Sequence, residues 1–95
     1  MFAVIRHYHF DPKDSAEIDQ QVRDVFVPLI RKASGFVSYH WLDTGKGDGA
    51  SLSVFRDKAG AEESVRLAAD FVAKSLSKFV AVRPEVIEGP VVAHS

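Results

Sequence analysis

The stretch FVSYHWLDTGKGDGASLSVFR, residues 36–56, decides the fold. Residues 36–42 and 50–56 are short runs rich in aromatic and β-branched side chains, as is typical of strands. The connection DTGKGDG, residues 43–49, holds three glycines and reads as a flexible hairpin tip. The pattern therefore predicts two antiparallel strands joined as a hairpin.

Alternation along residues 50–56 bears on which side chains are buried, because successive strand residues point to opposite faces. Leu52 and Val54 are apolar and share one face, so we expect them to face the helices. The same assignment places Ser51, Ser53 and Phe55 on the other face of the sheet.

Before the hairpin, residues 14–33 have apolar residues at helical spacing. Asp14 followed by Glu17 resembles a capping box, which predicts that Asp14 caps this helix. Pro28 lies inside the pattern and lacks a backbone N–H, so we expect a kink or break near Asp24.

After the hairpin, residues 57–79 show a second helical pattern, with Asp57 as the expected cap. Strands are predicted at both ends of the chain, over residues 2–10 and 85–93, and Pro90 places the last one at a sheet edge or bulge. The order β-α-β-β-α-β predicts an α+β, ferredoxin-like domain with a four-stranded antiparallel sheet and both helices on one face.

Composition limits the function classes. The 95 residues are 46% hydrophobic, have a formal net charge of −1 and include no cysteine. One domain spanning residues 1–95 is expected. Scattered charges argue against nucleic-acid binding, and no apolar run is long enough for a membrane span. No signal peptide is recognised, so a cytoplasmic location is the expectation.

The first strand is apolar on both faces. One face carries Ala3, Ile5, His7 and His9, and the other carries Phe2, Val4, Arg6, Tyr8 and Phe10. A sheet with helices on one side would then leave a large apolar patch uncovered, which is uncommon in a monomer. We expect a homodimer formed through the open sheet face; a monomer whose tail folds over that face is the alternative.

A charge in the middle of an apolar strand also needs an explanation, because charged side chains are rarely buried unpaired. Arg6 is predicted to pair with Glu85 or Glu88 on the adjacent last strand, or else to be exposed.

Three segments resemble the antibiotic biosynthesis monooxygenase superfamily: SGFVSY at 34–39, LSVFRD at 52–57 and EGPVV at 88–92. The resemblance extends over nearly the whole chain in element order. It implies a dimeric α+β barrel, in which the two sheets pack across the dimer. Members include quinone-forming oxygenases that use no cofactor, haem-degrading enzymes, stress-response proteins and proteins of no known activity.

The resemblance also supplies positions for catalytic residues. Haem-degrading members use Asn, Trp and His, and the corresponding residues here are His7, Phe55, and Ser64 or Val65. Quinone-forming members use Asn and Trp four residues apart, where this chain has Ser51 and Phe55. The chain contains no Asn at all.

The residues themselves suggest a general base in a cavity, because imidazole transfers protons near neutral pH. His7 is the first candidate and His40 the second. The expected cavity-lining residues are Ile5, His9, Tyr39, Trp41, Ser53 and Phe55. Large aromatic rings of this kind line pockets for aromatic ligands, although they more often fill a core or an interface.

Three functions remain open from the sequence. The first is monooxygenation of a small aromatic or polyketide-like substrate without a cofactor. The second is a non-catalytic ligand-binding or stress-responsive dimer. The third is a metal-dependent variant, since His7 and His9 share a strand face and His40 is the one plausible third ligand. No metal or cofactor is expected under the first two functions.

Overall fold

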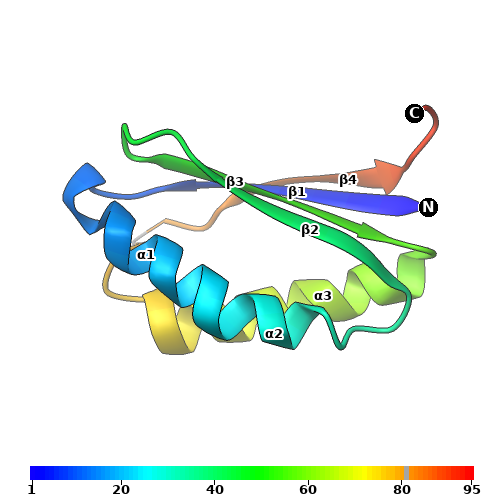
Figure 1. Ribbon diagram of the computed structural model, residues 1–95, viewed down its shortest axis with the longest axis horizontal. Helices are drawn as coiled ribbons and strands as arrows, with labels where there is room; N and C mark the ends of the chain where they lie inside the picture. Colours follow the sequence, from blue (N-terminus) through cyan, green and yellow to red (C-terminus); the bar gives the residue numbers. More distant parts are fainter. Residues whose placement is uncertain (81) are drawn as a thin grey trace.

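Four antiparallel strands form one sheet in the computed structural model of the protein, which describes residues 1–80 and 82–95. The strands are β1 (Phe2–His9), β2 (Phe36–Asp43), β3 (Asp48–Phe55) and β4 (Glu85–Pro90). Their order across the sheet is β2-β3-β1-β4 (Figure 1). The predicted β2–β3 hairpin is confirmed, and β4 lies beside β1 at the sheet edge, as Pro90 requires.

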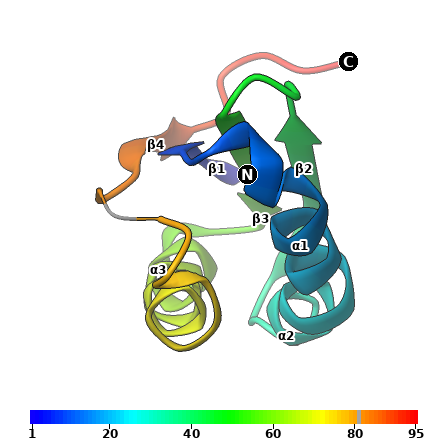
Figure 2. The ribbon, with the colours of Figure 1, turned by 90° about the vertical axis from the view of Figure 1, so that its left-hand side faces the viewer.

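Two helical segments pack side by side against one face of this sheet (Figure 2). The first consists of α1 (Ser15–Gln21), a π-helical turn (Val22–Phe26) and α2 (Val27–Ile30). The second consists of α3 (Lys58–Phe71) and a π-helical turn (Val72–Leu76). The predicted ferredoxin-like α+β architecture is confirmed, and the opposite face of the sheet carries no helix in the part of the chain described.

Pro28 disturbs the first helical segment near Asp24, as expected, but the segment widens instead of breaking. Proline has no N–H, so the carbonyl of Asp24 cannot receive its usual helical bond. The backbone N–H of Val27 instead bonds to the carbonyl of Val22, five residues back. The wide turn keeps the two halves of the helix on one path.

The expected cap at Asp14 is wrong. Its side chain makes no capping hydrogen bond. Asp11 instead accepts a hydrogen bond of 3.0 Å from the backbone N–H of Lys13, and Pro12 opens a short 3-10 turn ahead of α1. Proline is favoured at the first helical position, so the first helical turn begins earlier in the chain, at Pro12. The predicted Asp57 cap is confirmed by its 3.1 Å hydrogen bond from the N–H of Gly60.

The core lies between the sheet and the helices. Its buried apolar residues are Val4, Tyr8, Phe10, Ile18, Val22, Phe26, Ile30, Ala33, Phe55, Ala61, Ala68, Phe71, Leu76 and Val80. None of the helices within the described ranges combines the length and hydropathy needed to cross a membrane.

The expected orientation of β3 is wrong. Ser51, Ser53 and Phe55 are buried beneath the helices, whereas Leu52 and Val54 lie on the open face. Phe55 buries more apolar area than either aliphatic residue could, which decides the strand's orientation. The two small serines leave room under the helices for the aromatic rings of β2.

The start of α3 packs closely against the segment that leads into β2, and a substitution at this contact tests how close the packing is. A Cβ at Gly60 would collide with the backbone carbonyl of Ser34, whereas a Cβ at Gly89 would meet nothing within 4 Å. We therefore expect Gly60→Ala to lower the free energy of unfolding by about 1–3 kcal/mol.

Chemical denaturation of both variants measures this difference. The matched control Gly89→Ala should stay within about 0.5 kcal/mol of the wild type. Equal stability of the two variants would contradict the close approach of α3 to Ser34.

Candidate functional site

The eight residues predicted to form one site lie on two opposite faces of the sheet. Ile5, His7, His9 and His40 occupy the open face, and Tyr39, Trp41, Ser53 and Phe55 face the helices. The strand register fixes this division, because neighbours in register share a face: Ile5 pairs with Leu52, which pairs with His40. The sheet therefore separates the predicted bases from the predicted aromatic wall.

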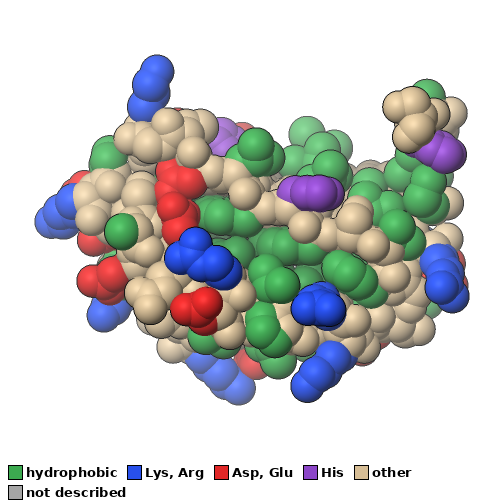
Figure 3. Space-filling model, in the orientation of Figure 1, with side chains coloured by type: hydrophobic (Ala, Val, Ile, Leu, Met, Phe, Trp, Pro, Cys, Tyr) green, Lys and Arg blue, Asp and Glu red, His purple; other side chains and the backbone are tan. Residues whose placement is uncertain are grey.

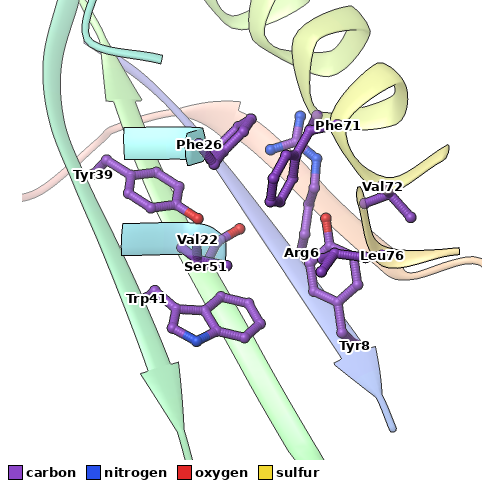
Figure 4. A pocket seen from close by; sticks show the side chains of 11 residues that line it. Arg6, Tyr8, Val22, Phe26, Tyr39, Trp41, Ser51, Phe71, Val72 and Leu76 are labelled. Atoms are coloured by element: carbon purple, nitrogen blue, oxygen red, sulfur yellow. The ribbon is translucent and has the colours of Figure 1, made fainter. Parts of the chain in front are cut away.

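A small cavity of about 10 Å³ lies between the sheet and the helices, with room for about one water molecule. Its lining residues are Arg6, Tyr8, Val22, Phe26, Tyr39, Trp41, Ser51, Ala68, Phe71, Val72 and Leu76. Figure 4 shows polar groups from three strands directed into a wall of aromatic and aliphatic side chains. Of the predicted site residues, Tyr39 and Trp41 are part of this lining.

Arg6 is the only charged residue among the cavity's described lining residues, and it is 3% exposed. Neither Nη1 nor Nη2 has a hydrogen-bond partner among the residues that the structure describes. Burial lowers the pKa of its guanidinium. The expected pairing with Glu85 or Glu88 is wrong. Glu85 lies on the open face beside His7, and Glu88 lies on the same face as Arg6 but makes no hydrogen bond with its guanidinium among the described residues; its charge only opposes the lowering of that pKa.

Two tyrosines flank this guanidinium, and burial raises the pKa of both Tyr8 and Tyr39. Their rings are fixed by aromatic contacts: Tyr8 lies 5.7 Å from Trp41, and Tyr39 meets Phe26 edge-on at 5.3 Å between ring centres. Both phenols stay neutral at physiological pH and can act as hydrogen-bond donors.

Trp41 is held in place by the first helical segment. Its indole Nε1–H donates a 2.8 Å hydrogen bond to Asp19 of α1. Burial raises the pKa of Asp19, whereas the backbone N–H of Gly45 lowers that of the neighbouring Asp43. The bond anchors α1 over β2 and fixes one wall of the cavity.

A groove of about 690 Å³ between α3 and β4 reaches Arg6 and Tyr8 from the surface. Figure 2 shows that α3 and β4 lie on the same side of the molecule. Its other lining residues are Val65, Ala68, Ala69, Val72, Ala73, Ser77, Val80, Val82, Arg83, Pro84 and Val86. The groove gives a molecule much larger than water a route from the surface to Arg6.

On the open face, His7 and His9 meet two carboxylates that sequence reasoning did not associate with them. Asp48 of β3 and Glu85 of β4 each lie within 3.5 Å of nitrogens from both imidazoles. The hydrogen bond with Glu85 raises the pKa of His9 and lowers that of Glu85. The sequence signal was indirect: both carboxylates begin strands that flank β1.

His40 is absent from this group of described residues. It lies on β2, with β3 between it and β1. The predicted third ligand of a histidine metal site is therefore wrong, since Asp48 takes that place beside His7 and His9.

Solved structures establish the fold class. Neither family models nor curated proteins give a match to the chain. A protein of unknown function from Nitrosomonas europaea superimposes with a TM-score of 0.83 at 18% identity, covering 99% of this chain and 91% of that one. An antibiotic biosynthesis monooxygenase gives 0.72 at 15% identity, covering 98% of this chain and 100% of that one.

A monooxygenase from Streptomyces coelicolor, solved with the ligand nanaomycin D, gives a TM-score of 0.71 at 13% identity. The match covers 99% of this chain and 90% of that one. The fold is thus that of the antibiotic biosynthesis monooxygenases, as the sequence resemblance implied. At these identities the likeness concerns the fold alone.

Ionisation of the buried phenols of Tyr8 and Tyr39 reports whether water reaches the cavity. Because the folded pKa of both tyrosines is raised, their contribution to stability is fully present below about pH 10, the unfolded value, and is lost as the pH rises through the folded values. We expect no tyrosinate absorbance near pH 10 in the folded protein.

An alkaline titration followed by ultraviolet absorbance and circular dichroism tests this. Tyrosinate should appear together with unfolding, and urea-unfolded protein is the control. Ionisation of either phenol near pH 10 with the fold intact would show that water reaches the cavity.

Proposed function

We propose that this protein oxidises a small, acidic aromatic molecule with O₂ and no cofactor, holding the anionic oxygen of the substrate at Arg6. The observation that carries the proposal is the buried guanidinium whose two terminal nitrogens lack partners within the described chain. A buried cation of this kind is stabilised by a bound anion, and planar guanidinium recognises carboxylates and phenolates well.

The size of the two spaces sets the pose of the substrate. The inner cavity accommodates about one water-sized group, so the acidic oxygen belongs there. The rings lie in the groove between α3 and β4, whose volume of about 690 Å³ falls within the range of small-molecule sites. Its lining of valines and alanines suits an aromatic hydrocarbon surface.

The chemistry requires stabilisation of negative charge in a dry site. Arg6 lowers the free energy of the phenolate or enolate that forms when the substrate loses a proton. The electron-rich anion then reacts with O₂ at an activated ring CH₂. One oxygen atom becomes the new carbonyl, and the other leaves as water with the two hydrogens, so four electrons pass from carbon to O₂ and no external reductant is needed.

The imidazoles play no part in this scheme. His7 and His40 lie across the sheet from Arg6, so the substrate's proton passes to solvent in the groove. The neutral hydroxyls of Tyr8 and Tyr39 donate hydrogen bonds to the substrate oxygens beside Arg6.

Arg6→Met separates a functional role from a structural one. The variant removes an unpaired buried charge, so we expect Tm to rise by about 5–15 °C. With an anthrone that bears phenolic hydroxyls as the probe, we expect kcat/KM to fall by about 100-fold.

Oxygen uptake and quinone absorbance measure the reaction, with one O₂ consumed per quinone formed. Arg6→Lys keeps the charge and serves as the control for a specific guanidinium contact. Wild-type rates in Arg6→Met would refute the role of Arg6, and tight binding of the anthrone without oxygen uptake would favour a non-catalytic binding protein.

A homodimer through the open sheet face is the second part of the proposal. Ile5 and Ile87 are paired in the register and are 41% and 71% exposed, with Leu52 in the same row. Figure 3 shows hydrophobic side chains and histidines gathered along the upper rim, where the open face lies. A second copy would bury this row.

Ile87→Glu tests the dimer, because the interface would have to bury an unpaired carboxylate from each copy. We expect light scattering to give twice the mass of one chain for the wild type and the single-chain mass for the variant. Leu29→Glu is the control, since Leu29 is also a large apolar residue and is 41% exposed on α2, away from the open face. A monomeric wild type at micromolar concentration would contradict the dimer.

A further inference from the structure

Four titratable side chains meet at one end of the open sheet face. In the strand register, His9 pairs with Asp48 of β3, and His7 pairs with Glu85 of β4. Because β1 lies between β3 and β4, the two imidazoles are flanked by a carboxylate on each side. The arrangement follows from the sheet order, since Glu85 is 76 residues from His9 in the chain.

Each imidazole faces both carboxylates. Asp48 Oδ1 lies 3.1 Å from His7 Nε2 and 3.0 Å from His9 Nδ1. Glu85 Oε1 lies 3.5 Å from His7 Nδ1 and 3.0 Å from His9 Nε2. All four ring nitrogens therefore have a carboxylate oxygen as their neighbour.

Counting protons shows that this cluster needs positive charge. A neutral imidazole has one N–H, so two neutral rings supply two donors for four contacts. If both N–H groups point to Glu85, the lone pairs of His7 Nε2 and His9 Nδ1 face an oxygen of Asp48. Three electron pairs directed into one small space repel one another unless a cation lies between them or both imidazoles are protonated.

The spacing suits a metal ion. Zn²⁺ binds nitrogen and oxygen at about 2.0–2.2 Å, which puts neighbouring ligand atoms of a tetrahedron roughly 3.3 Å apart. The two contacts of Asp48 are close to that value, and single ligand atoms of His7, His9 and Asp48 all lie within 4.8 Å of one another. The side chains are 40–51% exposed, so water can supply the fourth ligand.

We propose that His7, His9 and Asp48 bind a divalent transition-metal ion of the Zn²⁺ type on the open face of the sheet. A set of two imidazoles and one carboxylate binds ions of this type in preference to Mg²⁺ and Ca²⁺. Glu85 is a positioning residue: it accepts the N–H of His9 Nε2 and lies 3.5 Å from His7 Nδ1, and so orients both rings with their other nitrogens toward the ion.

The metal experiment uses the full chain without a histidine tag, stripped with a chelator. Calorimetric titration with Zn²⁺ is expected to give one ion per chain, with negligible heat from Mg²⁺. Titration with Co²⁺ is expected to give the intense visible absorption of a tetrahedral site, which reports the ligands independently of any activity.

Substitutions identify the ligands. His9→Ala and Asp48→Asn are expected to abolish the Zn²⁺ heat and the Co²⁺ spectrum, and Glu85→Gln to weaken the affinity by about 10–100-fold. His40→Ala, a histidine on the same face outside the cluster, and Arg6→Met, on the other face, are expected to bind Zn²⁺ as the wild type does. Circular dichroism confirms that each variant is folded.

Two results would overturn the metal site: a wild-type protein that takes up no Zn²⁺ at micromolar concentration, or an Asp48→Asn variant that binds it unchanged. Protonation of both histidines, the other source of positive charge, would produce the first of these. Because Arg6→Met is expected to impair the oxidation and to leave Zn²⁺ binding unchanged, failure of the metal site and failure of the proposed oxygenase are told apart.

Discussion

The structure is organised around one constraint, the buried guanidinium of Arg6. Aromatic rings enclose it, and its terminal nitrogens have no hydrogen-bond partner among the described residues. Burying an unpaired ion costs several kcal/mol, a large share of the stability of about 5–15 kcal/mol that a small domain has. Aliphatic packing at Arg6 would make a more stable core. This cost supports the proposal that Arg6 binds an anion, and the groove that reaches it from the surface supplies the route.

Alternation along β1 lets one strand carry two kinds of chemistry. Arg6 and Tyr8 point beneath the helices, whereas His7 and His9 point to the open face. The 3.3–3.4 Å rise of a strand keeps the two groups adjacent in sequence, while the thickness of the sheet separates them. The buried cavity favours charge stabilisation, and the half-exposed cluster favours ligand exchange with solvent. This is why neither face of β1 reads as simply polar.

Much of the fold could be predicted, because turns, caps and strand composition are local signals. The glycine-rich hairpin, the Asp57 cap and the edge position of Pro90 all follow from the chemistry of single residues. The orientation of β3 could not be predicted by comparing Leu52 with Ser51, because Phe55 decided it from the end of the strand.

The site was harder to predict because it depends on contacts between distant strands. His7 and His9 were recognised as a potential pair of ligands, but Asp48 and Glu85 join them only once the sheet order is known. His40 fits the set by residue type but lies on β2, beyond β3. Likewise the lack of a hydrogen-bond partner for Arg6 depends on Glu85 lying on the opposite face and on Glu88 staying out of contact on the same face, which a sequence pattern does not contain.

Charge connects the proposed metal site to the proposed dimer. Two neutral imidazoles with Asp48 and Glu85 carry a net charge of −2, and a proposed sheet-to-sheet interface over that cluster would have to desolvate this charge. A divalent cation makes each cluster neutral, so the apolar row around Ile5 and Ile87 can be covered without burying net charge. By linkage, a metal ion that favours the dimer must itself bind more tightly to the dimer by the same factor. The cavity at Arg6, on the far side of the sheet, takes no part in this coupling.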